Sequence, residues 1–174
     1  AVTQAAGCSY SLNPTSHNAS VAGGSSSFDV NTMAGCNWTS SGVPAWITGV
    51  PSSGTSTTTV NFTVAANTGP ARNANIVIEG QTFAVSQAGC TYAVAPGSLT
   101  FSAAGTPPQD IALTTQASCN WTATPSDSWI TSVSGGTGPG NGTIRIELQL
   151  HTGPAARTGS VSVGGETVSI TQNP

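Results

Sequence analysis

The sequence predicts an all-β protein built from two tandem sandwich units, and three observations lead to that fold class. The block Cys36-Asn37-Trp38-Thr39 recurs 83 positions later at residues 119–122, and a Trp-Ile-Thr triplet follows each copy at the same distance. Short segments that alternate apolar and polar residues are separated by Gly, Pro and Asn, as in strands joined by turns. No segment shows the periodicity of an amphipathic helix. A repeat of this length can bury a modest core.

The strands of the first unit follow from alternation along the chain. Residues 8–12 alternate apolar and polar, and Asn13-Pro14 ends that strand. A loop rich in Ser, Ala and Gly is expected to lead to the next strand at residues 27–33. Cys36 and Trp38 are two positions apart and therefore share one face of a strand. Further strands are expected at residues 59–64, 74–78 and 82–86, the last two joined by a tight hairpin turn.

The second unit repeats this order, and the chain begins with a fragment of the same pattern. Strands of the second unit are expected at residues 99–101, 111–113, 143–148, 160–163 and 167–170. Residues 1–7 resemble residues 84–89 at the end of the first unit. The predicted organisation is therefore a strand-like extension or linker at residues 1–7, a first domain at 8–89 and a second at 90–174.

Four cysteines predict one disulfide in each unit. Cys8 lies 28 residues before Cys36, and Cys90 lies 29 residues before Cys119, so the repeat favours these two pairs over the other two pairings. A metal site would need clustered ligands such as Cys-x-x-Cys, which the sequence lacks, and no metal or cofactor is expected. Disulfides are characteristic of oxidising compartments, which favours an extracellular protein.

Charge excludes several classes of partner. The chain has three arginines, no lysine and six carboxylates, for a formal net charge of −3. Binding of nucleic acid, or of anionic membranes, requires several cations on one face, so neither partner is expected. No apolar run is long enough to span a membrane, and no signal peptide is present. The chain is interpreted as a mature form whose export signal has been removed, or as a piece of a larger secreted protein.

The motifs in their order resemble a known family. The succession Cys-x-Trp, Trp-Ile, Asn-x-Gly-x-x-Arg and Val-x-Gln-x-Gly resembles the BACON-type immunoglobulin-like domains of secreted bacterial proteins. The residues that carry the resemblance are Trp46, Asn67, Arg72 and Gln87, then Trp129, Arg157 and Gln172. The second unit departs from the pattern where His151 replaces the asparagine and where Asn173-Pro174 replaces Ala-Gly. The resemblance implies an immunoglobulin-like sandwich, with carbohydrate or mucin binding, or a spacer role, as its expected functions.

Catalysis is not expected. Glycosidases need two convergent carboxylates, and none of the six here recurs at an equivalent place in the other unit. A nucleophilic mechanism would need a histidine base, and the two histidines fall in predicted loops. Trp38 and Trp121 are expected in the core, while Trp46 and Trp129 are divided between core packing and a sugar platform. The two repeat arginines are expected to bond nearby backbone carbonyls or a carboxylate.

Five Asn-x-Ser/Thr sequons provide candidate glycosylation sites. They begin at Asn18, Asn37, Asn61, Asn120 and Asn141. Chance occurrence is the competing interpretation, because the chain is rich in Ser and Thr.

Two functional hypotheses remain. In the first, the protein is a structural or adhesive subunit that joins end to end, with the strand-like residues Ala1, Val2, Thr3 and Gln4 adding to a sheet edge of another copy. Lysines, which commonly protect sheet edges, are absent. In the second, the protein is a carbohydrate-binding module or a spacer. The expected partners are therefore other copies, cell-surface components or glycans.

Overall fold

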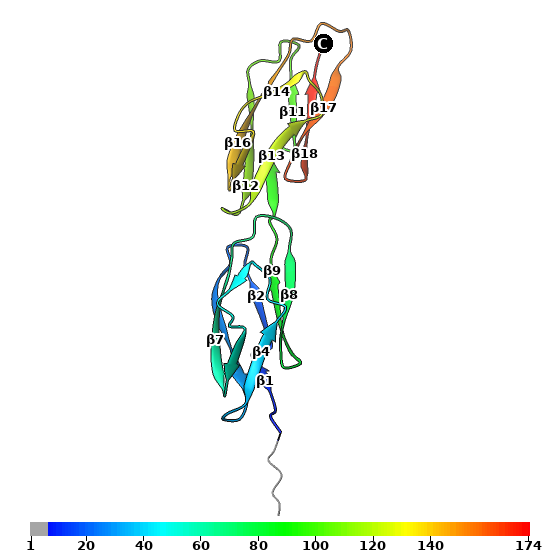
Figure 1. Ribbon diagram of the computed structural model, residues 1–174. Helices are drawn as coiled ribbons and strands as arrows, with labels where there is room; N and C mark the ends of the chain where they lie inside the picture. Colours follow the sequence, from blue (N-terminus) through cyan, green and yellow to red (C-terminus); the bar gives the residue numbers. More distant parts are fainter. Residues whose placement is uncertain (1–6) are drawn as a thin grey trace, which may run out of the picture. The chain divides into compact units, whose positions relative to one another are not determined.

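The computed structural model describes residues 7–174, except for the side chains of residues 132–134. It divides into unit 1, which ends at Gly89, and unit 2, which begins at Cys90. The described residues contain strands and turns and no helix. Each unit is a two-sheet sandwich with an immunoglobulin-like arrangement (Figure 1), which confirms the predicted fold class. The expected strand at Ala1–Gln4 lies outside the described residues and stays a prediction.

In unit 1 a four-stranded sheet packs against a five-stranded sheet. The smaller sheet has the order β1 (Ser11–Asn13), β3 (Gly24–Asn31), β7 (Thr58–Val64), β5 (Ile47–Thr48). The larger has the order β2 (Ser16–Ala19), β9 (Gln81–Gln87), β8 (Arg72–Ile78), β4 (Asn37–Ser41), β6 (Ser53–Thr55). All pairings are antiparallel except that β2 runs parallel to β9.

Unit 2 repeats this topology. Its smaller sheet has the order β10 (Tyr92–Ala95), β12 (Gln109–Thr115), β16 (Gly142–Leu148), β14 (Ile130–Ser134). Its larger sheet has the order β11 (Ser98–Phe101), β18 (Glu166–Gln172), β17 (Arg157–Val163), β13 (Asn120–Pro125), β15 (Thr137–Pro139). Here β11 runs parallel to β18.

The cores differ in composition although the topology is shared. In unit 1 the rings of Phe28 and Phe83 stack with centroids 4.2 Å apart, and Phe62 meets Phe83 edge-on at 5.5 Å. Unit 2 fills the same space mainly with aliphatic side chains: Ile111, Leu113, Ile144, Ile146, Val161, Val163, Val168 and Ile170. Each core also contains a tryptophan, because Trp38 and Trp121 are only 1% and 6% exposed. The expected core role of these two indoles is confirmed.

Both predicted disulfides are present. Cys8 bonds to Cys36 and Cys90 bonds to Cys119. In antibody-type domains the bridge links the central strands of the two facing sheets. Here it links a residue before the first strand to the residue that directly precedes β4 or β13. Each bridge therefore closes a covalent loop around the first three strands of its unit.

The first strand of each unit differs from the sequence prediction. The strand expected from Cys8 begins only at Ser11, and Cys8 is exposed rather than aligned with buried Leu12. The segment interpreted as a Ser-rich loop contains β2, which pairs with β9. The burial of β2 alternates, but its residues Ser-His-Asn-Ala do not alternate between apolar and polar types, so the pattern that identifies half-buried strands is missing from the sequence. Its counterpart in the chain order of unit 2, β11, is alternating and was predicted, whereas β10 was missed.

The closing hairpin turns follow the prediction. Two residues join β8 to β9, Glu79 and Gly80, and both have positive φ, 46° and 81°. Gly164 and Gly165 do the same between β17 and β18. Two positive φ values in a two-residue loop define the type I′ turn, whose twist matches that of the flanking strands.

Candidate functional site

The residues that carry the family resemblance gather around the last strand of each sandwich. In unit 1 the Arg72 Nε donates to Gln87 Oε1 at 2.8 Å, and its Nη2 donates to the Ala65 carbonyl at 3.1 Å. The guanidinium lies over the Trp46 ring, 4.5 Å from the centroid. Gln87 is 2% exposed, and its Nε2 donates to the Ala65 carbonyl at 2.9 Å. These contacts tie β8 and β9 to the loop that follows β7.

Unit 2 builds the same cluster with one exchange. Arg157 Nε donates to Gln172 Oε1 at 2.8 Å, and its guanidinium lies 4.4 Å from the Trp129 centroid. In unit 1, Asn67 Nδ2 donates to the Pro70 and Ala88 carbonyls and holds the turn before β8. In unit 2, His151 Nε2 lies 2.7 Å from the Ala155 carbonyl. The imidazole thus takes up a loop contact of the kind that the asparagine makes.

This Arg–Gln–Trp cluster is architectural. The arginine N–H groups donate to carbonyl and amide oxygens of the same unit. The sequence predicted backbone carbonyls or a carboxylate as partners, and the backbone carbonyls are observed. Trp46 and Trp129 are half-buried and pack against the cores. One face of each ring is covered by a guanidinium, so that face is not an open platform for a sugar ring.

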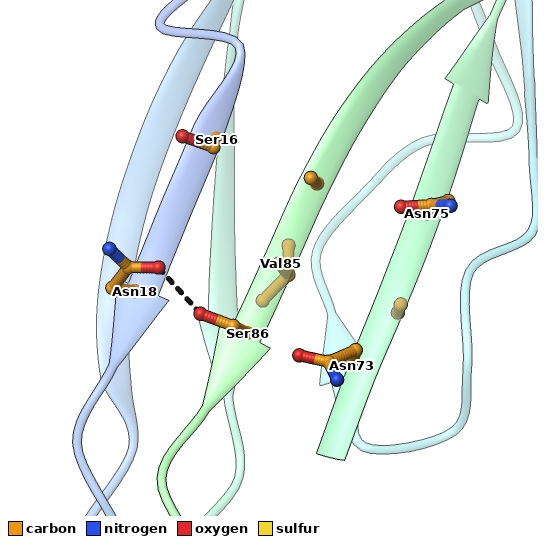
Figure 2. A pocket seen from close by; sticks show the side chains of 8 residues that line it. Ser16, Asn18, Asn73, Asn75, Val85 and Ser86 are labelled. Atoms are coloured by element: carbon orange, nitrogen blue, oxygen red, sulfur yellow. Dashed lines mark hydrogen bonds between the residues drawn. The ribbon is translucent and has the colours of Figure 1, made fainter. Parts of the chain in front are cut away.

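A different surface offers uncharged polar groups to a ligand. A groove of about 270 Å³ lies on the outward face of β2, β9 and β8 in unit 1. Its lining includes Ser16, Asn18, Asn73, Asn75 and Ser86, and contains neither a charged nor an aromatic side chain. Figure 2 shows these side chains on the three strands, with Ser86 Oγ bonded to Asn18 Oδ1 at 2.5 Å.

Strand register explains why these side chains converge. Asn18, Ser86 and Asn73 are opposite one another across β2, β9 and β8. Two residues further along the strands, the next row of outward-facing side chains consists of Ser16, Ala84 and Asn75. Ala84 is the shortest member of the two rows, so the taller side chains around it leave a depression. The groove was not identified from the sequence, because β2 was interpreted as a loop.

The equivalent face of unit 2 carries hydroxyl groups in the same rows. One row pairs Thr100, Thr171 and Thr158, and the next pairs Ser98, Ser169 and Ser160. Neighbouring side chains in such rows are about 4.8 Å apart across strands and about 6.7 Å apart along them. Within the described residues, none of these six hydroxyls takes part in a side-chain hydrogen bond. Both units therefore present a neutral polar face on the larger sheet.

The carboxylates are dispersed and several bond to their own unit. Glu79 Oε1 accepts from both the backbone N–H and the hydroxyl of Thr39, and Asp29 Oδ1 accepts from the Thr59 hydroxyl at 2.7 Å. Among the described residues no group of three or more His, Cys, Asp or Glu side chains could hold a metal ion. In the described part of the chain no helix is long and apolar enough to cross a membrane.

The five sequon asparagines are all exposed. Asn18 lines the groove, and Asn61 lies on the outward face of the smaller sheet of unit 1. Asn141 Oδ1 accepts from the Thr115 backbone N–H at 2.8 Å. Asn37 and Asn120 each accept, through the backbone carbonyl, a tyrosine hydroxyl at 2.6 Å. Their modification stays a prediction.

Family models match both units. Residues 37–88 match a model described as "BACON: Putative binding domain, N-terminal", and residues 91–173 match a model described as "Viral BACON domain". The chain is a tandem of BACON domains. The resemblance seen in the sequence is thereby confirmed, and the second description extends the family to viral proteins. Neither BACON model describes an enzyme. The family together with the two disulfides indicates an extracellular protein, because disulfides persist in oxidising compartments.

The solved structures similar to this chain match it with TM-scores below 0.5. A Bacteroides ovatus GH5 xyloglucanase in complex with a XXXG heptasaccharide is 26% identical over 48% of this chain and 19% of its own, with a TM-score of 0.43. The I9–I11 tandem of titin is 9% identical over 91% of this chain and 62% of its own, with a TM-score of 0.38. InvD of Yersinia pseudotuberculosis is 15% identical over 96% of this chain and 57% of its own, with a TM-score of 0.36.

The chain thus spans less than two thirds of the length of each of these three structures. A comparison with curated proteins gave no match.

Proposed function

We propose that the chain is a non-catalytic extracellular adhesion module that binds a neutral, hydroxyl-rich glycan on the outward face of the larger sheet of unit 1. The groove on β2, β9 and β8 carries this proposal, because its polar lining consists only of amides and hydroxyls. Such groups both donate and accept hydrogen bonds, as sugar hydroxyls require, and they provide no opposite charge to a charged ligand.

The composition of the groove also sets the expected affinity. Net hydrogen bonds between neutral groups contribute about 1 kcal/mol each. Four such bonds would give at most about −4 kcal/mol before the cost of immobilising the ligand, so a single site is expected to bind no tighter than a Kd of about 1 mM. No aromatic ring lines the groove to add stacking energy. Useful adhesion would then require several modules acting together, since linked weak sites gain from effective concentration.

A glycan array tests this proposal through paired variants. Asn73→Ala with Asn75→Ala removes two amides from the groove, while Asn61→Ala removes one exposed amide from the smaller sheet. We expect the signal on neutral glycans to fall about 25-fold in the groove variant, about fivefold for each amide, and to stay unchanged in the Asn61 variant. No signal from the native chain on the array, together with no saturable binding in a titration with neutral oligosaccharides at millimolar concentration, would leave the spacer role in its place.

Assembly by strand addition is a separate hypothesis that rests on the strand-like residues 1–4. The edge strands of unit 1 have two to four residues, so they offer few backbone groups to an added strand. Deletion of residues 1–7 separates the two roles. Loss of filaments in electron micrographs, with unchanged stability of the monomer, would establish assembly. Native protein that stays monomeric in size exclusion and forms no filaments would remove it.

A further inference from the structure

Each disulfide encloses three strands in a closed covalent loop. In unit 1, β1, β2 and β3 all lie between Cys8 and Cys36, and β4 begins at the residue after Cys36. In unit 2 the strands β10, β11 and β12 lie between Cys90 and Cys119, and β13 follows directly. The bonded cysteines have Cα atoms only 5.8 and 5.6 Å apart. A pull on the first cysteine of a unit is therefore passed to the second through the sulfur atoms.

We propose that these bridges are mechanical bypasses, which carry tension along the chain past the first three strands and load it onto β4 and β13. The enclosed strands contribute to the core but cannot be extended while the bridge is intact. This inference goes beyond the proposed function, and it holds whatever ligand the module binds.

The sheet topology determines how the bypassed load is resisted. In unit 1, β4 and β9 both run antiparallel to β8, so they are parallel to each other. Tension enters at the start of β4 and leaves at the end of β9, which are opposite ends of the sheet. The ladders on β8 are thus loaded along the strands, and their hydrogen bonds must break together rather than one at a time. Trp38, on β4, is 1% exposed and anchors the loaded strand in the core.

Loss of the bridge would change which strands resist the pull and how much chain is released when the unit unfolds. Tension would then reach two edge strands in turn: β1, which pairs antiparallel with β3 over three residue pairs, and β2, which pairs in parallel with β9 over four. At about 3.6 Å per extended residue, the 28-residue loop of unit 1 would add about 95 Å to the unfolding extension after subtraction of the bridged Cα distance. The loop of unit 2 would add a similar length. Reduction would thus release a reserve of chain from each unit.

Single-molecule force spectroscopy on the full chain tests the bypass by moving the point of attachment. One handle is fixed at the C-terminus, and the other is attached either at the N-terminus or through a clickable side chain at Ala34, an exposed position two residues before Cys36. In the native chain we expect the same unfolding forces for both attachments, with length increments that agree within about 10 Å. In a Cys8→Ser, Cys36→Ser chain pulled from the N-terminus, one of the two increments should grow by about 95 Å, and its unfolding force should change.

The intact bridge of unit 2 is the internal control, because its increment should be the same in both chains. A native chain whose unfolding force depends on the attachment point would overturn the bypass, since the first strands would then carry load. An increment in the bridgeless chain that does not lengthen would overturn it equally. If the bridgeless unit fails to fold, the comparison of attachments in the native chain still decides the question.

Discussion

Replacing Gln87 by methionine is the sharpest test of the Arg–Gln–Trp cluster. The side chain is 2% exposed; its Oε1 accepts from Arg72 Nε, and the two hydrogens of its Nε2 are shared among three backbone carbonyls within 3.3 Å. Each of these three carbonyls still accepts a hydrogen bond when the Gln87 amide is removed. The donors that remain are Gly23 N–H for Ser20, Asn67 N–H for Val21 and Arg72 Nη2 for Ala65. The unpartnered group is therefore the charged Nε. Its bond is worth about 2 kcal/mol, and the weaker amide bonds add about 1 kcal/mol together.

The Gln87→Met variant should therefore lower the free energy of unfolding of unit 1 by about 3 kcal/mol, or its Tm by about 12–24 °C. Urea denaturation followed by tryptophan fluorescence measures this, because Trp46 stacks on the same arginine. Gln81→Met is the matched control, an exposed glutamine on the same strand that should cost less than about 0.5 kcal/mol. A loss for Gln87→Met as small as that of the control would refute the stabilising role of the cluster.

Three further predictions concern the bridges, the packed glycines and the sequons. Cys8→Ser with Cys36→Ser should destabilise unit 1 by about 3–4 kcal/mol in the chain-entropy model, and an unchanged urea midpoint would contradict it. Gly54→Ala should cost about 1–3 kcal/mol, since its Cβ would lie 2.2 Å from Trp38 Cζ2, whereas Gly97→Ala meets nothing within 4 Å; equal melting temperatures would refute the argument. Intact-mass measurement of the naturally produced protein should show added glycan mass, and an unmodified mass would remove the sequon hypothesis.

The fold was predictable because the same order of motifs occurs in both halves of the chain. A repeated Cys-x-Trp block fixed both the division into units and the pairing of Cys8 with Cys36 and of Cys90 with Cys119, which spacing alone would have left open. Long central strands such as β7 and β16 alternate cleanly because one face is buried and the other exposed. The hairpin turns were evident because Gly follows Glu79 between two such strands.

The candidate site was less predictable, because it depends on pairing between distant segments. Asn18 and Asn73 are 55 positions apart and meet only because β2 and β8 both flank β9. The strand β2 reads Ser-His-Asn-Ala, in which only Ala19 is apolar, so its sequence resembles a loop although His17 and Ala19 face inward. The sequence placed Arg72 near backbone carbonyls correctly, but the Gln87 partner lies 15 residues away on the next strand. Neither contact has a local signal.

Side-chain amide chemical shifts test the central claim, that the groove of unit 1 binds neutral glycans, most directly. The ¹⁵N-labelled chain, titrated with neutral oligosaccharides into the millimolar range, should show saturable shifts of the Asn18, Asn73 and Asn75 amides with a Kd of about 1 mM or weaker. The Asn61 amide on the other sheet should not move. Shifts that occur only outside β2, β9 and β8, or no shift with any neutral glycan, would contradict the account.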